Sequence, residues 1–511
     1  MAGLATTVAV AACVIAIVLA DLRWLRVAQR EHYLFGSTSS FVSRWWFGRK
    51  ANISLFSIAF AGIVLSSILP EAAVIAAGPV ALGPLGLGVR GRTSPLVWTR
   101  RLKTLALVVV TLQALGILLG VVSGSVALAA ALMAALSPTF VDAGLLITGS
   151  WEKRQIATFV DQARRRLRDV SPTVVAITGS YGKTSTKGYI AHLLGSTRTV
   201  LATPASFNNR AGLSRAVNEH LVPGTDVFIA EMGTYGAGEI AELCEIATPE
   251  IAVLTAIGPV HLERFGSEEA ILRAKVEIFD KANVCVLNVD DERLAKEATR
   301  LAAAGKTVWR CSSQAEESDV RVVVEAGEMI VVHLREIIAS APEPNASPTN
   351  VACAVAVALE LGVGDVDLSG LLANLPVAPH RQEITKTAKG VVVIDDTYNA
   401  NPASVQRGLE LLERLGRGEG GRRAVVTPGM VELGQMQAVA NEEFARGAAL
   451  SATDLVVVGH TNRKALLDGS RGTSLNVVTV DELPEAVQWV RSNLETDDAV
   501  FYANDLPDHF P

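Results

Sequence analysis

The sequence predicts an α-helical membrane region followed by two α/β domains. Three observations lead to this fold class. Half of the 511 residues are hydrophobic, and long uncharged stretches gather in the first 150. A glycine-bearing turn lies between an apolar run and a helix-like segment within residues 173–194. Apolar runs then alternate with helix-like segments to the C-terminus, which favours mostly parallel sheets. A chain of this length forms about three domains, and we place them at residues 1–150, 151–376 and 377–511.

Charge divides the chain at the same place. Residues 1–150 carry 11 Lys and Arg against 4 Asp and Glu, a net charge of +7, and residues 151–511 carry 35 against 48, a net charge of −13. Only 19% of all residues are charged, which argues against a disordered chain or one that coats nucleic acid. We therefore expect a lipid bilayer around the first part, cytoplasm around the second, and no nucleic-acid partner.

The first 150 residues contain apolar stretches of about the length that crosses a bilayer. The first could be a signal peptide, but no basic segment precedes it and further apolar stretches follow, so we interpret it as a retained helix. The third is interrupted by Gly and Pro, and a re-entrant segment is its alternative. Four or five spans are therefore possible, and five are preferred, at residues 3–20, 51–69, 72–87, 104–121 and 126–148.

The orientation of these spans follows from their basic connections, since loops rich in Lys and Arg stay cytoplasmic. Five spans with the N-terminus outside place everything after residue 150 in the cytoplasm, and the expected location is a multi-pass protein of the cell membrane. An anchor is the plainer role for this region. Asp142, near Pro138, is the main hint of a substrate-handling role. The basic connections contain Arg23, Arg26, Arg30, Arg44, Arg49 and Lys50; Arg90, Arg92, Arg100, Arg101 and Lys103; and Lys153, Arg154, Arg164, Arg165, Arg166 and Arg168.

A phosphate-binding turn begins the second part of the chain. Residues 173–178 form a buried-strand run, and a helix-like stretch begins after Ser185. A strand, a glycine turn and a helix N-terminus point backbone amides at an anion, while a lysine reaches the terminal phosphates and a hydroxyl binds magnesium. The sequence therefore predicts a P-loop NTPase-like central domain with a nucleotide site at Gly179, Ser180, Gly182, Lys183, Thr184 and Ser185.

Polar residues follow three other apolar runs in the same way. Glu231, His261 and Asn288 come at or just after the ends of runs 226–230, 251–257 and 284–287. The carboxyl ends of parallel strands meet at one edge of a sheet, where ligands bind. Singly, each residue also has a structural explanation as a capping carboxylate, a loop histidine or a turn former. Their shared position favours a common site.

The ordered motifs resemble the Mur ligase family, and some are closest to its MurF branch. The resemblance covers about residues 170–511. It implies a C-terminal Rossmann-like domain, for which apolar runs at 391–394, 424–427, 455–458 and 499–502 supply strands. Residues 312–348 are interpreted as a variable excursion of the central domain. The motifs are TGSYGKTS at 178–185, SFNN at 206–209, EMG at 231–233, HLERFG at 261–266, AKVEIF at 274–279 and IDDTYNANP at 394–402.

The resemblance implies an ATP-dependent ligase. Such enzymes transfer the γ-phosphoryl group of ATP to a substrate carboxylate, and an incoming amine attacks the resulting acyl phosphate, so that ADP and phosphate are released. The enzyme mostly positions groups and neutralises charge. The implied partners are ATP, a carboxylate-bearing envelope precursor, and an amino acid or dipeptide.

The resemblance also implies individual catalytic and metal-binding roles. Lys183 and the P-loop amides hold phosphates, Thr184 and Glu231 bind one Mg²⁺, and His261 resembles a ligand of a second. Lys275 matches the family lysine that reacts with carbon dioxide to give a carbamate ligand for Mg²⁺. Without that context, Lys275 is an ordinary lysine on a helix.

Further nucleotide and substrate contacts follow from the same motifs. Asn288 resembles the adenine contact, while Arg381 and Asp396 resemble nucleotide contacts from the C-terminal domain, after a proline-bearing hinge at 375–379. Closure at the hinge would exclude water from the acyl phosphate. Candidates for substrate contact are Asn208, Asn209, Asn399 and Asn401, each with ordinary turn chemistry as an equal alternative.

One departure from the family affects the substrate. MurF begins with a soluble domain that binds the UDP-sugar end of its substrate, and here the hydrophobic region occupies those positions. A lipid-linked or polymeric envelope substrate is therefore an alternative to the UDP-linked one. An ATP-driven transporter would not need Lys275 or a hinged nucleotide-contact domain. An inactive binding module is disfavoured because Lys183, Thr184, Glu231, His261, Lys275 and Asp396 are all present.

Overall fold

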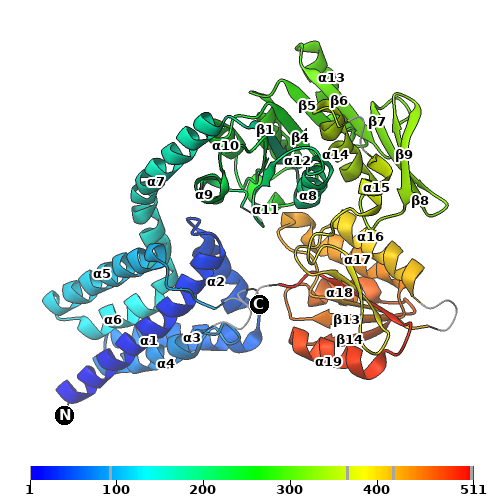
Figure 1. Cartoon of the computed structure of the whole chain (residues 1–511). Helices are drawn as coiled ribbons and strands as arrows, with labels where there is room; N and C mark the ends of the chain where they lie inside the picture. The colour runs from blue at the N-terminus through cyan, green and yellow to red at the C-terminus, as the bar shows by residue number, and fades with distance from the viewer. Residues whose placement is uncertain are drawn as a thin grey trace. The chain divides into compact units, whose positions relative to one another are not determined.

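The computed structural model describes residues 2–90, 95–205, 207–363, 367–416, 421–506 and 510, with the side chains of Ala2 and of 150–155 left out. Arg92, Ser206 and residues 507–509 and 511 of the unassigned C-terminal tail lie outside the described residues, as do the side chains of Lys153 and Arg154. The chain forms two compact units (Figure 1). The first comprises residues 1–155 and 506–511, and the second comprises residues 156–505.

The first unit is helical. Small side chains let its helices approach closely: Ala16 of α1, Ala73 of α4 and Ala130 and Ala131 of α6 are fully buried. Large apolar side chains such as Leu119 stay exposed. The elements are α1 (Ala2–Arg30), α2 (Ser37–Phe47), α3 (Lys50–Ser66), a 3₁₀ turn η1 (Pro70–Ala72), α4 (Ala73–Leu82), α5 (Arg100–Val122), α6 (Val126–Ala135) and α7 (Ser137–Val170), the last of which continues into the second unit.

The preferred count of five spans is not supported. Among the described residues, the helices Gly3–Arg30 and Arg100–Val122 are long and apolar enough to cross a membrane. The count rises to four if the bent pairs α2–α3 and α6–α7 each form one span. The segment predicted as the third span contains only the short helix α4, whose ten residues rise about 15 Å, half of the hydrocarbon thickness. The fifth predicted stretch breaks at Leu136, with a bend of 72°.

Helix α1 also extends beyond its predicted end at Ala20. The charges that suggested a loop lie on the helix and have partners inside the unit. Oδ1 of Asp21 accepts a hydrogen bond from Nε2 of Gln113 at 2.9 Å, and the Arg23 guanidinium donates to the carbonyl oxygens of Val80 and Ala81. Arg23, Arg26 and Arg30 are therefore helical residues rather than part of a basic loop.

The second unit begins with a sheet that is parallel except at one end. Its strand order is β2-β3-β1-β4-β5-β6-β7-β8-β9, and among the described strands of this sheet only β7, β8 and β9 pair antiparallel. The segment expected to be a variable excursion thus adds a β-meander to the edge of this sheet. The strands are β1 (Thr173–Thr178), β2 (Val200–Ala202), β3 (Val227–Glu231), β4 (Ile251–Leu254), β5 (Val284–Asn288), β6 (Thr307–Ser312), β7 (Val320–Glu325), β8 (Glu328–His333) and β9 (Glu336–Pro342).

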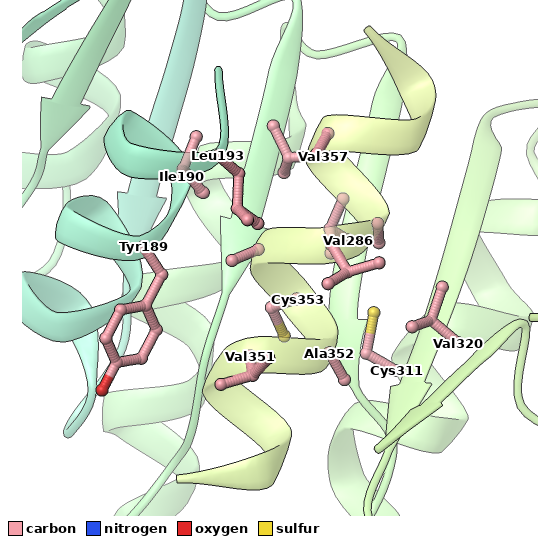
Figure 2. Packing of buried hydrophobic residues seen from close by; sticks show 14 of the residues in the cluster. Tyr189, Ile190, Leu193, Val286, Cys311, Val320, Val351, Ala352, Cys353 and Val357 are labelled. Atoms are coloured by element: carbon pink, nitrogen blue, oxygen red, sulfur yellow. The ribbon is translucent and has the colours of Figure 1, made fainter. Parts of the chain in front are cut away.

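Helices cover both faces of this sheet and complete the central domain. Figure 2 shows Ile190 and Leu193 of α8 packed with Val351 and Val357 of α14 over the strands. This buried cluster fixes the helix that follows the P-loop. The helical elements are α8 (Lys183–Leu194), α9 (Arg210–His220), α10 (Glu239–Ile246), α11 (Leu262–Phe265), α12 (Glu268–Val276), η2 (Glu277–Phe279), α13 (Glu292–Ala303), α14 (Pro348–Glu360) and α15 (Leu368–Ala373).

The C-terminal domain is built on a second sheet. Its order is β10-β11-β15-β12-β13-β14, with β10 antiparallel and the other strands parallel. The four strands predicted from apolar runs are present within two residues of their expected limits. The elements are β10 (Glu383–Lys386), β11 (Val392–Asp396), α16 (Pro402–Leu415), β12 (Arg423–Thr427), η3 (Gly434–Met436), α17 (Gln437–Ser451), β13 (Asp454–Val458), α18 (Arg463–Ser470), β14 (Asn476–Val480), α19 (Leu483–Asn493) and β15 (Ala499–Ala503).

Candidate active site

The glycine turn joins β1 to α8 as the sequence predicts. Gly179 and Gly182 have φ angles of 154° and 79°, a backbone region that residues with a side chain rarely adopt. Lys183 is the first residue of α8, and its Nζ donates to the carbonyl oxygen of Gly179 at 2.6 Å. Burial lowers the pKa of Lys183 to about 8, with the charge of Arg381 adding to the effect and that of Glu231 opposing it. The turn therefore holds the amine of Lys183, and the negative charge of an incoming phosphate would favour its protonated form.

Glu231, at the end of β3, is surrounded by hydrogen-bond donors. Its Oε2 accepts from Oγ1 of Thr184 at 3.0 Å and from Nζ of Lys187 at 2.9 Å, and its Oε1 accepts from Nδ2 of Asn208 at 3.2 Å. Burial raises the pKa of Glu231, but the charges of Lys187 and Lys183 and the hydrogen bonds outweigh burial and lower it overall. The carboxylate is thus an anion held in place beside the P-loop.

Lys275 lies behind the P-loop, on the last turn of α12. Its Nζ donates to the carbonyl oxygen of Gly179 at 3.2 Å, the same oxygen that Lys183 contacts. Burial, with the nearby charge of Lys183, lowers the pKa of Lys275 well below its usual value. Lys275 is therefore not an ordinary surface lysine: its side chain is buried beside a small cavity of about 40 Å³ that His261 and Asn208 also line.

His261 precedes α11 and touches both domains. Its imidazole packs edge-on against the ring of Tyr235, with ring centres 4.8 Å apart. Its Nδ1 is paired with Oε2 of Glu432, which lies in the loop after β12 of the C-terminal domain. The histidine is thus held by one contact from each domain.

A single cavity of about 410 Å³ joins the central and C-terminal domains within the second unit. Most of the predicted site residues line it, from both sheets. Gly179 and Lys275 line the small neighbouring cavity instead, and Asn209 lines neither. The predicted residues that line the main cavity are Ser180, Gly182, Lys183, Thr184, Ser185, Asn208, Glu231, His261, Asn288, Arg381, Asp396, Asn399 and Asn401.

The C-terminal domain contributes a cation and a buried carboxyl group. The guanidinium of Arg381 lies over the ring of Tyr398, 4.2 Å from its centre. Asp396, at the end of β11, is 4% exposed, and its Oδ2 has no hydrogen-bond partner among the described residues. Burial raises the pKa of Asp396 to about 6, against hydrogen bonding to Ser404 and the charge of Arg381. This carboxyl group is placed to accept a hydrogen bond from a ligand hydroxyl.

Several predicted asparagines make local structural contacts. Oδ1 of Asn209 caps α9 by accepting from the amide of Gly212, and Asn401 caps α16 in a reciprocal pair with Ser404. Asn288 donates to the carbonyl oxygen of Thr255 and accepts from the amide of Asp290. For Asn209 the capping contact, away from the cavity, favours the turn explanation. Asn401 caps α16 and also lines the cavity, and Asn288 lines the cavity while it makes its turn contacts.

Sequence reasoning missed several residues of this site. Lys187 lies one helical turn after Lys183, a spacing that places both on the same face of α8, and this was the available signal. Tyr189 and Asn350 of the central domain and Arg407 of the C-terminal domain line the cavity without belonging to a recognised motif. Glu432 is 171 residues from His261 in the sequence, so nothing local connects the two.

Two family models match this part of the chain. The Mur ligase middle domain matches residues 177–358, and the Mur ligase glutamate ligase domain matches residues 380–503. Together they cover most of both sheets that enclose the cavity.

Individual relatives agree with this assignment. The UDP-N-acetylmuramoyl-tripeptide--D-alanyl-D-alanine ligase of Mycobacterium leprae is 35% identical over 64% of this chain and 70% of its own length. The Bacillus subtilis protein of the same name is 31% identical over 57% of this chain and 62% of its own length. The crystal structure of MurF from Thermotoga maritima in complex with ADP covers 68% of this chain and 79% of its own, with 28% identity and a TM-score of 0.59. The prediction of an ATP-dependent ligase is confirmed: the chain belongs to the Mur ligase family and is a MurF-like peptide ligase of peptidoglycan synthesis.

Proposed function

We propose that the cavity between the two sheets is where a substrate carboxylate is activated and joined to an amine. A carboxylate oxygen attacks the γ-phosphorus of ATP and ADP leaves. The amine nitrogen then attacks the acyl carbon, the amide bond forms, and inorganic phosphate and a proton leave. One observation carries the proposal. Lys183, Thr184 and Glu231 from the first sheet line the same cavity as Arg381 and Asp396 from the second.

The residues have distinct roles in this proposal. The P-loop amides and Lys183 hold the β- and γ-phosphates, and Arg381 neutralises charge from the opposite side. Asp396 accepts a hydrogen bond from the nucleotide. Asn208 keeps Glu231 oriented, and Asn399 contacts the phosphate or the acceptor. Because two domains supply these groups, their closure around ATP would exclude water from the acyl phosphate.

The oxygen donors fit Mg²⁺. The hydroxyl of Thr184 and the ionised, buried carboxylate of Glu231 lie 3.0 Å apart, and hard oxygen ligands are those that Mg²⁺ prefers. When bound, the ion would neutralise charge on the nucleotide phosphates. We propose that His261 and Lys275 would hold a second ion.

The environment of Lys275 supports its conversion to a carbamate. Only a neutral amine attacks carbon dioxide, and the pKa of Lys275 is held well below its usual value by burial. The nitrogen attacks the carbon of CO₂ and loses a proton, which turns a buried amine into an anionic oxygen donor. The small cavity beside Nζ gives the group room between Lys275 and His261.

The proposed substrates are those named for the relatives, a UDP-muramoyl tripeptide and D-alanyl-D-alanine. A second candidate acceptor is a lipid-linked or polymeric envelope precursor at the cytoplasmic face. The observation in its favour is that the family models begin at residue 177, while the first unit consists of apolar helices. We propose that this unit tethers the enzyme to the cell membrane, with domain limits at 150 and 376. The N-terminus-outside orientation requires an odd number of spans and depends on how the bent pairs are counted.

The acceptor can be tested with membranes that contain the full chain. ADP release is measured with D-alanyl-D-alanine and either UDP-muramoyl tripeptide or the same peptide on a polyprenyl pyrophosphate. Lys183→Ala membranes give the background. Turnover with neither acceptor would contradict the proposed ligase substrates. Turnover with the UDP-linked acceptor alone would contradict the lipid-linked candidate, and a clear preference for the lipid-linked acceptor would support it.

A further inference from the structure

A carboxylate from the C-terminal domain holds the histidine of the central domain. Glu432 follows β12, and its Oε2 is paired with Nδ1 of His261. Both side chains are partly shielded, with 29% of Glu432 and 22% of His261 exposed. With Glu432 ionised, its carboxylate accepts a hydrogen bond from Nδ1, which leaves Nε2 as the ring nitrogen that a metal ion would bind.

The loop that carries Glu432 is docked against the segment that carries His261. The carbonyl oxygen of Glu432 accepts a hydrogen bond from the amide of Glu263 at 3.4 Å. A side chain at Gly434 would begin only 3.4 Å from the same amide nitrogen. The loop that carries Glu432 thus contacts the His261 segment through its backbone as well as through the Glu432 side chain.

Both members of the pair adopt an uncommon backbone conformation. His261 has φ 58° and Glu432 has φ 65°, in the left-handed region that residues other than glycine seldom occupy. Such conformations persist where the surrounding structure requires them, and they concentrate at functional sites. Here they turn the two side chains toward each other from opposite domains.

We propose that Glu432 is a positioning residue that completes the His261 metal site when the C-terminal domain closes. In the closed arrangement Glu432 fixes the ring orientation and the tautomer of His261 and makes Nε2 a stronger ligand. When the C-terminal domain swings away, the carboxylate leaves with it and the site weakens. Occupancy of the second metal site thereby depends on closure of the C-terminal domain around ATP. This inference rests on the proposed role of His261 as a ligand of the second ion.

The plainer alternative is that Glu432 only fastens the two domains together. The two explanations differ in which binding affinity depends on Glu432 and in whether that dependence requires His261. A fastening residue would change nucleotide affinity, whereas a positioning residue changes the affinity for one metal ion and loses its effect once His261 is absent.

Binding of Mn²⁺ to the full-length protein in detergent, with a non-hydrolysable ATP analogue, tests the proposal by electron paramagnetic resonance. Variants are Glu432→Ala, Glu432→Gln, His261→Ala, the double variant His261→Ala with Glu432→Ala, and Glu443→Gln as an exposed control on α17. None of these substitutions introduces glycine or proline, so each backbone position keeps a residue of similar conformational range. Circular dichroism checks that each variant is folded.

We expect the wild type and the Glu443→Gln variant to bind two Mn²⁺ ions. Glu432→Ala should weaken the second ion ten- to a hundredfold, the usual effect of removing the carboxylate behind a metal-binding histidine. Glu432→Gln should have a smaller effect, because its amide oxygen still accepts from Nδ1. The affinity for the ATP analogue should stay within twofold, and the double variant should be no weaker than His261→Ala.

Four outcomes would overturn the inference. If Glu432→Ala bound both ions as tightly as the wild type, Glu432 would not position His261, and the two-metal proposal would stand. If the double variant were much weaker than His261→Ala, or if only nucleotide affinity fell, Glu432 would act elsewhere. If the wild type bound a single ion, the proposed second metal site would fail and the inference with it.

Discussion

Nζ of Lys187 lies 2.9 Å from Oε2 of Glu231, and both side chains are almost completely buried, at 7% and 1% exposed. Lys187 also donates to the carbonyl oxygen of Ala205 at 2.6 Å. An amine on the P-loop helix thus holds the carboxylate that we propose as a Mg²⁺ ligand. The pair keeps Glu231 ionised at a depth where an unpaired carboxylate would take up a proton.

We expect Lys187→Met to destabilise the protein and to inactivate it. Methionine fills similar space but leaves Glu231 buried without its cation, and breaking a buried pair from one side costs about 3–5 kcal/mol. The free energy of unfolding of the 156–505 unit is measured by urea denaturation of the full chain. ADP release reports activity.

The double variant Lys187→Met with Glu231→Gln provides the decisive comparison. It should be more stable than Lys187→Met alone, because the uncompensated charge is gone, while activity stays lost. Lys281→Met is the exposed control, since the Lys281–Glu245 pair is 40% and 54% exposed and solvent screening should leave its loss with little effect on stability. Equal stability losses for Lys187→Met and Lys281→Met would contradict the importance of the buried pair.

The sequence was sufficient to predict the parallel strands and the glycine turn because both depend on local patterns. Residues 173–178 form a strand at the predicted limits. Glu432 could not be found in this way, since its role depends on a contact between two domains. The end of α1 was misplaced because Asp21 and Arg23 looked like loop residues, and partners for them inside a helical unit cannot be deduced from hydropathy. Burial of Lys275 beside Gly179 likewise depends on packing across the sheet edge.

Asp396 gives a prediction about pH. Its pKa is raised by burial to about 6 from a usual value of 3.8. The folded state therefore holds the proton more tightly than the unfolded state, so the stability that this group contributes is present below pH 3.8 and is lost as pH rises through 6. Asp396→Asn should raise the melting temperature of the nucleotide-free protein more at pH 8 than at pH 4. From the size of the pKa shift, the gain in the free energy of unfolding at pH 8 should exceed the gain at pH 4 by at most about 3 kcal/mol.

The neighbouring Asp395 is a control of opposite sign. Burial raises its pKa, but hydrogen bonds from Thr397 and His380 outweigh burial and lower it overall. Its contribution is present above pH 3.8 and is lost as pH falls, so Asp395→Asn should destabilise the protein at pH 7 more than at pH 3. Melting curves from pH 3 to 8 measure both variants. The same pH trend for the two variants would refute the assignment for Asp396.

Lys275→Ala is expected to lose most ligase activity and to regain part of it with a short carboxylic acid. The added carboxylate would fill the space of the carbamate and supply its oxygen donor. Lys183→Ala should show no such rescue, because it removes a cation from the phosphates. Carbon-13 NMR of the wild type with labelled bicarbonate should show a carbamate signal that Lys275→Ala lacks. Full activity of Lys275→Ala without an added acid would exclude the carbamate.

The contacts of Asp142 bear on whether the first unit is an anchor or handles substrate. Its carboxylate accepts hydrogen bonds from the amides of Gly36, Thr38 and Ser39 and so satisfies the N-terminus of α2. We therefore expect Asp142→Ala to weaken the helical unit by about 1–3 kcal/mol, through the lost cap and the amides left unpaired. Thermal unfolding of the full chain in detergent measures this loss.

The same variant should keep its ligase activity with the accepted substrate, because its carboxylate is engaged in holding α2. Glu71→Ala, at an exposed acidic residue of the first unit, is the control and should leave both properties unchanged. An Asp142→Ala protein with unaltered thermal stability and a much higher KM for the acceptor would reverse the conclusion. The buried carboxylate would then contact substrate, and the helical unit would be part of the acceptor site as well as an anchor.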